Sequence, residues 1–258
     1  MSFPNVIYGR YGDEKVAQST AIGSLPYGQL MILPDGRKAR HALAPSGTAI
    51  VAGSFYQCPA DVADTAREKA LALAATVAVG ATSVVVTMGG TALTADQYVG
   101  GYLITASSAG TGVGRLYKIL TNNSAAASST ATFGLEPSDP IETALSGGTT
   151  TIGIRQNQYR NLIVTSADTA QTGPNAGVAP VAASAGFSFW VMRSGPVAAH
   201  VDAGTAVTAG NPVTASSATA GALGLAVGTA VYKARDIVGH VMTVPAADQF
   251  AIVNLELE

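Results

Sequence analysis

Apolar and polar positions alternate most clearly at the end of the chain. Over residues 251–258 every second residue is apolar, and the residues between them include Asn254, Glu256 and Glu258. A period of two is the pattern of a strand that buries one face. The apolar face consists of Ala251, Val253, Leu255 and Leu257. The pattern predicts a final strand in which Val253 and Leu255 pack in a core or a subunit interface.

A second alternating run follows Gly186. Phe187, Phe189 and Val191 share one face and Trp190 lies on the other, so we expect these residues in a core or subunit interface as well. Between the two runs, short apolar segments are separated by Gly, Pro, Asn and Asp at intervals of about 8–12 residues, a spacing typical of small β-sandwiches and barrels. We therefore predict a C-terminal β-barrel or sandwich domain over residues 166–258.

The middle of the chain is also rich in strand signals. Residues 59–165 are predicted to form a central antiparallel β domain, and the polar segment 166–184 marks its boundary with the C-terminal domain. The candidate strands are Ser83–Met88, Tyr98–Thr105, Val113–Leu120, Thr130–Leu135, Thr149–Ile154 and Asn161–Thr165. Pro59–Ala75 is the one helix candidate, and its alternative is a loop that leads into a strand from Leu71.

Proline and glycine interrupt residues 1–58 every few positions, which leaves no room for a long helix. We predict an extended N-terminal arm with one hairpin. Its strands are Gln29–Leu33 and Arg37–Leu43, and the turn between them is Pro34-Asp35-Gly36, where Pro presets φ and Gly permits a positive φ. The predicted fold class is thus mainly β, with at most one short helix.

The composition is poor in charge. Of the 258 residues, 48% are hydrophobic and 12% charged, and the net charge is −2, whereas about a quarter of the residues in a soluble protein are charged. A surface with so few charges is typical of a protein whose surface is largely covered by neighbouring subunits in an assembly. There is no basic field to bind nucleic acid, no apolar run long enough to span a membrane, and no N-terminal secretory signal. Cys58 is the only cysteine, so an internal disulfide is excluded.

The sequence contains no complete motif for catalysis, cofactor binding or metal binding. The run 110–115, GTGVGR, lacks the third glycine of a dinucleotide fingerprint and precedes a strand, so a hairpin turn is favoured. His41, His200 and His240 lack partners at metal-ligand spacing, and Cys58 has no nearby base. We therefore expect no catalytic, cofactor-binding or metal-binding residues, and no enzyme activity.

The basic residues gather near the N-terminus. Residues 1–45 contain five basic and three acidic residues, a net charge of +2, which leaves −4 for the remainder. Such an arm is suited to an acidic surface, although an ordinary solvated hairpin is an equal alternative. The residues expected to contact a partner are Tyr8, Arg10, Tyr11, Arg37, Lys38 and Arg40.

Sequence segments along nearly the whole chain resemble those of capsid decoration (cement) proteins of tailed bacteriophages. They include YGDEK and SLPYGQLMILPDGRKARHALA in the arm, the segment from AVGATSVVV to GRLYKI, and GFSFWVMRSGPVAAHVDAGTAVTAGNPV near the C-terminus. The resemblance implies a structural protein, made in the host cytoplasm, on the outer capsid surface of the virion. Its implied partners are the major capsid protein and copies of itself, with a trimer favoured and a dimer possible.

Two other functions stay open. A head-fibre or tail-associated protein would bind a host surface glycan, but Trp190 is the only tryptophan and a sugar-binding groove usually has several aromatic platforms. A β-rich polysaccharide hydrolase or lyase would need a long repetitive β-helix, and the chain has no fixed-period repeat.

Overall fold

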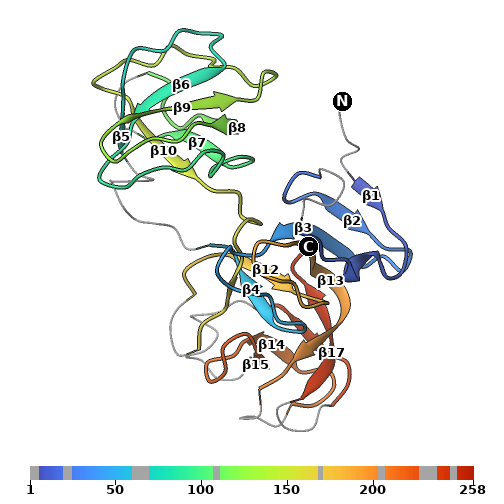
Figure 1. Cartoon of the computed structure of the whole chain (residues 1–258). Coiled ribbons are helices and arrows are strands. Elements are labelled where there is room, and N and C mark those ends of the chain that lie inside the picture. Colours follow the sequence, from blue (N-terminus) through green and yellow to red (C-terminus); the bar gives the residue numbers. More distant parts are fainter. Residues whose placement is uncertain are drawn as a thin grey trace. The chain divides into compact units, whose positions relative to one another are not determined.

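The computed structural model describes residues 6–19, 25–59, 70–106, 111–167, 171–202, 207–226, 237–244 and 249–258. These residues form strands, with one short 3-10 helix, η1 (Asp13–Lys15). The prediction of a mainly β fold is confirmed. The chain divides into two compact units (Figure 1). Unit 1 combines residues 1–60 with 158–258, and unit 2 is residues 61–157.

Unit 1 is built on one large mixed sheet. Its main path, in spatial order, is β1 (Val6–Tyr8), β2 (Leu30–Ile32), β3 (Lys38–Leu43), β13 (Ser188–His200), β17 (Phe250–Glu256), β16 (Gly239–Val241), β14 (Pro212–Ala215) and β15 (Leu223–Leu225). A side branch contains β4 (Phe55–Gln57), β11 (Ile163–Val164) and β12 (Asn175–Val178). β1 runs parallel to β2, and the other pairs of these strands in the described part of the sheet are antiparallel.

The N-terminal region is part of this sheet, which corrects the prediction of a separate arm over residues 1–58. The predicted hairpin is present, since β2 and β3 pair and Gly36 has a φ of 84° in the turn. However, β3 also pairs with β13, whose residues lie about 150 positions further on. The predicted domains 1–58 and 166–258 thus belong to one unit, because the hairpin strand β3 pairs on its other side with the long strand β13.

β13 is the centre of unit 1. Its first half pairs with β3 and its second half with β17. In the first half both faces are buried, and the predicted alternation is confirmed: Phe189 and Val191 lie in one core cluster, while Trp190 lies in another on the opposite face. Phe187 is half-buried and packs against the cluster of Phe189.

The final strand was also predicted correctly. Along β17, residues 251, 253 and 255 are buried in the same core cluster as Trp190, with Val253 at 0% and Leu255 at 1% exposure. Packing in a core, one of the two expected roles, is therefore confirmed for Trp190, Val253 and Leu255. The opposite face of β17 is open, and the second half of β13 is likewise buried on one side only.

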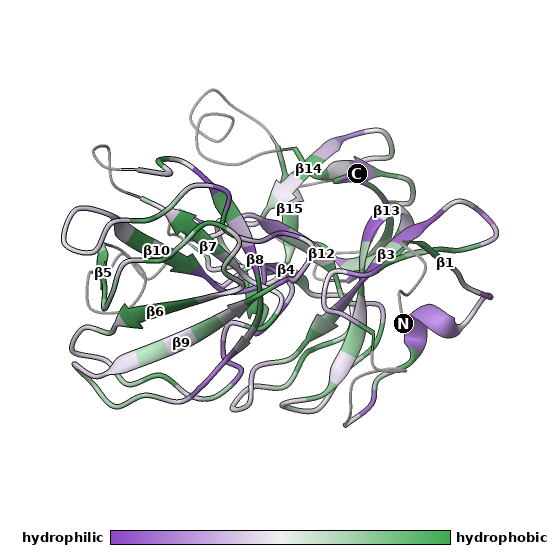
Figure 2. Ribbon diagram, turned by 90° about the horizontal axis from the view of Figure 1, so that it is seen from above, coloured by the Kyte–Doolittle hydropathy of each residue, from purple (hydrophilic) through white to green (hydrophobic). Residues whose placement is uncertain are grey.

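Unit 2 is a closed six-stranded antiparallel barrel. Around the barrel the order is β10 (Thr151–Arg155), β5 (Leu71–Leu73), β6 (Ser83–Thr87), β9 (Thr130–Leu135), β8 (Leu116–Asn122) and β7 (Tyr102–Thr105). Alternate residues point inward, and β6 and β10 are coloured mainly as hydrophobic in Figure 2. Phe133 and Tyr98 are fully buried in its core, with their rings edge to face at 6.2 Å.

The structure differs from the sequence prediction in three details of the central region. The closed barrel lies in the central region, and the C-terminal region instead completes the sheet of unit 1. The central unit ends before Gln158, so the predicted strand at 161–165 belongs to unit 1 as β11. Within the helix candidate 59–75, residues 71–73 form the strand β5, which agrees with the alternative of a strand from Leu71. Residues 60–69 lie outside the described residues.

A buried histidine lies beside Trp190. His41 is 0% exposed, stacks on Tyr27 with ring centroids 5.2 Å apart, and lies 5.4 Å from the Trp190 ring. Its Nδ1 is 3.3 Å from the Pro26 carbonyl oxygen, while Nε2 has no hydrogen-bond partner among the described residues. Burial lowers the pKa of His41 below its ordinary value, outweighing the hydrogen bond to Pro26, which acts to raise it.

This histidine should make stability depend on pH. Because the folded-state pKa is lowered, its contribution to stability is present above the unfolded value of about 6.5 and is lost as the pH falls below it. Denaturant unfolding of His41→Phe, which keeps an aromatic ring on Tyr27, should show a weaker loss of stability between about pH 7 and pH 5 than the parent protein. The control Val51→Ala changes an exposed residue of unit 1 that does not titrate, retains His41 and should retain the parent slope. Equal slopes for all three proteins would contradict the prediction.

Candidate interaction surface

Three of the six predicted contact residues lie at one edge of the unit 1 sheet. Tyr8 ends the edge strand β1 and is 82% exposed, and Tyr11 is 64% exposed in the turn before η1. Arg10 lies between them and is also exposed, and its backbone N–H donates a 2.8 Å hydrogen bond to Asp13 Oδ2. The structure thus presents these three side chains to solvent, and their contact with a partner stays a prediction.

Arg37 lies between two carboxylates. Its Nε is 2.7 Å from Asp35 Oδ2 and its terminal nitrogen is 3.4 Å from Glu14 Oε1. Glu14 is 3% exposed, and its second oxygen accepts a 2.7 Å hydrogen bond from the Gly12 N–H. Desolvation acts to raise the pKa of Asp35, but the hydrogen bonds and charge of Arg37 outweigh it, so this pKa lies below its usual value. Arg37 therefore fixes η1 against the β2–β3 turn.

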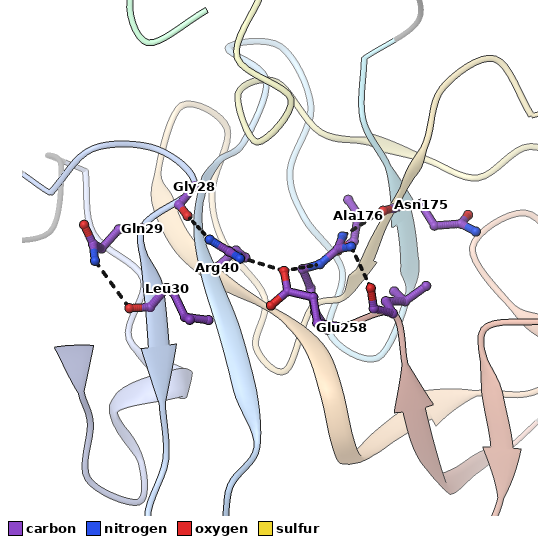
Figure 3. Close-up of polar contacts among 9 residues, drawn as sticks. Gly28, Gln29, Leu30, Arg40, Asn175, Ala176 and Glu258 are labelled. Atoms are coloured by element: carbon purple, nitrogen blue, oxygen red, sulfur yellow. Dashed lines mark hydrogen bonds and ion pairs between the residues drawn. The ribbon is translucent and has the colours of Figure 1, made fainter. Parts of the chain in front are cut away.

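Arg40 is held in a second cluster of charges. Its Nε is 2.8 Å from Glu258 Oε1, and it donates a 2.9 Å hydrogen bond to the Gly28 carbonyl; Figure 3 shows both contacts. The same carboxylate oxygen is 2.9 Å from Arg193 Nε. Arg193 also donates to the carbonyl oxygens of residues 175, 176 and 257. These contacts join β3, β12, β13 and the C-terminal residues, so Arg40 has a structural role.

Lys38 differs from its two arginine neighbours. It is half-buried on β3 and has no ion pair with any residue that the structure describes. Among the predicted basic contacts, Arg37 and Arg40 are thus neutralised within unit 1, whereas Arg10 and Lys38 are not. Sequence spacing alone did not separate the two groups, because the carboxylates Glu14 and Glu258 come from distant positions in the chain.

Apolar side chains gather on the open side of the unit 1 sheet. The core residues of β13, β17 and β16 point to the other side. The exposed apolar residues on this side, which we call the open face, are Pro196, Ala198, Met242, Phe250 and Ile252. Backbone pairing brings them together: Ala198 is the cross-strand partner of Ile252, and the Met242 N–H donates to the Ile252 carbonyl at 2.8 Å. Phe250 is 58% exposed, Met242 51% and Ile252 43%.

The open face was missed at the level of the sequence, although a signal was present. Ile252 falls on the side of the final strand that otherwise carries Asn254, Glu256 and Glu258. A single exposed apolar residue is common on protein surfaces, and it indicates an interaction site only where other exposed apolar residues adjoin it. The partners Ala198 and Met242 could not be recognised without the pairing of the strands.

A pocket of about 390 Å³ lies at the margin of the open face. It has an apolar wall and a charged wall, both within unit 1. The apolar wall is Pro180, Pro196, Val197, Ala198 and Ile252, and the charged wall is Glu14, Lys15, Asp35 and Arg37. The volume is within the usual range of small-molecule and side-chain binding pockets.

The other candidates for chemistry occupy structural positions. Cys58 is the one cysteine of the sequence and is buried. His240 Nδ1 lies 3.2 Å from Glu256 Oε1. Asp202 accepts a 2.5 Å hydrogen bond from Ser216 Oγ. The glycine-rich run 110–115 precedes β8, which pairs with β7 as the hairpin interpretation predicted. The described residues contain no group of three His, Cys, Asp or Glu side chains placed to hold a metal ion.

Comparison with known proteins gives no relative. No family model, no curated protein and no solved structure matches the chain. Among the described residues, no helix has the length and apolar character needed to cross a membrane. Trp190, the lone tryptophan, is 3% exposed and so does not offer a platform for a sugar ring.

Proposed function

We propose that this protein is a capsid decoration protein that binds the outer surface of mature tailed-phage heads at capsomer junctions and stabilises them. The observation that carries the proposal is the open face, a cluster of apolar side chains exposed on the unit 1 sheet. Burying apolar surface favours association, and the net affinity is what remains after the loss of translational and conformational freedom. The resemblance of the sequence to decoration proteins supports the choice of partner, the major capsid protein.

The low charge of the chain supports the same proposal. With 12% charged residues, the surface is suited to contact with neighbouring subunits of a shell. Stabilisation then follows from mass action, because a protein that binds the expanded lattice more tightly than the unexpanded one shifts the equilibrium toward it. We propose a homo-oligomer for the bound form, with a trimer favoured over a dimer, as the resemblance implies.

The proposal is tested by adding purified protein to phage heads that lack it. We expect saturable binding to expanded heads, with many copies on each head, and little binding to unexpanded heads. Copy number is counted by cryo-electron microscopy and gel densitometry, and decorated heads should lose their DNA or their shape at a higher temperature than bare heads. Binding of a few copies at one vertex, or equal binding to both kinds of head, would contradict decoration.

The contribution of the N-terminal region to binding of phage heads is measured with point substitutions in the same assay. Deleting residues 1–58 would remove β3, which pairs with β13, and would disrupt the fold of unit 1. The double variant Tyr8→Ala/Tyr11→Ala changes two exposed side chains instead. Reduced occupancy at unchanged melting temperature is expected if this edge contacts the shell. Unchanged occupancy would exclude these tyrosines as contacts.

A further inference from the structure

The pocket beside the open face has a preformed shape. Pro196, Val197 and Ala198 lie on β13 and Ile252 on β17, two strands that pair over seven residue positions. Gly195, just before them, has a φ of 85° and packs against Arg37, where a Cβ atom would meet the Arg37 side chain. Two prolines, Pro180 and Pro196, further limit movement of the apolar wall. Little conformational entropy is therefore lost when a side chain enters.

The charged wall carries no net charge. Arg37 is engaged by Glu14 and Asp35, so these three groups already satisfy one another. Lys15 is exposed and has no ion pair with a described residue. Two carboxylates and two cations sum to a net charge of zero in the pocket. The complementary ligand is therefore neutral and makes its main contact with the apolar wall.

The size of the open face argues against a closed dimer built on it alone. The seven residues of β17 span about 24 Å, and three adjacent strands about 14 Å, which gives a face of roughly 340 Å². A stable interface buries about 800 Å² on each partner. The open face is thus less than half of what a dimer needs, and it fits one contact among several on a larger surface.

We propose that this pocket receives one uncharged side chain, aliphatic or proline, from an extended segment of the capsid subunit, and that the segment crosses the open face. The proposal rests on the proposed function, because the shell supplies the remaining contact area. It assigns Ile252 and Ala198 as the residues that determine affinity. The four charges of the charged wall sum to zero, so the wall adds no net attraction for an acidic or a basic side chain.

Two substitutions at the pocket test the site. Ile252→Glu places a carboxylate on the apolar wall, and Ala198→Trp fills the space, and both positions are solvent-accessible, so the fold should persist. Each should lower occupancy of expanded heads at least about tenfold, because a buried unpaired charge or a steric clash opposes docking. The matched control is Val79→Glu in unit 2, at a residue 64% exposed, and it should bind like the parent protein. Melting curves check that all variants are folded.

Salt and cross-linking identify the occupant. Occupancy by the parent protein should change less than about twofold between low salt and 1 M NaCl, since apolar contacts are not screened. A photo-reactive p-benzoylphenylalanine at position 252 should cross-link to the major capsid protein, and the same group at position 79 should not. Loss of binding at high salt, or cross-links only to a second copy of this chain, would overturn the inference.

The assay separates the two proposals. If the parent protein does not decorate heads, the proposed function fails. If the parent decorates them and both pocket variants do so equally well, the function stands and the pocket inference fails.

Discussion

Replacing Trp190 with alanine is expected to lower the free energy of unfolding of unit 1 by about 3–5 kcal/mol. The indole is 3% exposed, lies in the larger core cluster with residues of β3, β13 and β17, and contacts the His41 ring. Truncation removes this apolar contact and leaves a cavity that paired strands cannot close. Chemical denaturation followed by far-UV circular dichroism measures the effect.

The control for Trp190→Ala is Tyr8→Ala, which also removes an aromatic side chain from unit 1. Tyr8 is 82% exposed, so its loss should change stability by no more than about 0.5 kcal/mol. An unchanged midpoint for Trp190→Ala would show that the indole does not support the core.

Replacing Phe133 with alanine should have a comparable effect on unit 2, also about 3–5 kcal/mol. Phe133 is 0% exposed inside the barrel and packs edge to face on Tyr98. A closed barrel has no free edge along which strands could shift to fill the space. The matched control is Leu116→Ala on the outer side of β8, at a residue 55% exposed, and it should cost less than about 1 kcal/mol. Similar losses for the two variants would contradict the prediction.

Together the two core variants test the division into units. Trp190 and Phe133 belong to separate core clusters, and those clusters have no residue in common. Differential scanning calorimetry should therefore resolve two transitions, with Trp190→Ala lowering one and Phe133→Ala the other. A single transition lowered by both variants would mean that the whole chain unfolds cooperatively.

Local patterns predicted the strands well where one face is buried. The alternation at 251–257 and at 187–191 identified the buried residues of β17 and the two-sided burial of β13. The Pro34-Asp35-Gly36 turn predicted the β2–β3 hairpin. These features depend on side-chain periodicity and on backbone φ preferences, which are properties of neighbouring residues.

Long-range pairing was the part that the local pattern did not predict. The arm was assigned as separate, although β3 pairs with β13, because hydrogen bonds between distant strands leave no mark in a short window of sequence. The barrel was placed in the C-terminal region for the same reason. Turn spacing indicates many short strands, but closure depends on which first and last strands meet, here β5 and β10.

The residues of the interaction surface were likewise predicted only in part from the local sequence. Tyr8, Arg10 and Tyr11 were named from the sequence and are exposed. Arg37, by contrast, is paired with its neighbour Asp35 and with Glu14, and Arg40 is paired with Glu258 at the other end of the sequence. The open face and its pocket combine β13, β16 and β17 with η1 and the β2–β3 turn.

By itself, the sequence determined that this protein is mainly β, poor in charge, and built from strands with the buried faces described above, because composition and a period of two are local properties. Only the tertiary structure decided that the N-terminal hairpin completes the C-terminal sheet, that the central strands close into a barrel, and that Ile252 lies beside Ala198 at a pocket. Those outcomes depend on the free energy of contacts between residues far apart in the chain, which exists only once the strands have paired.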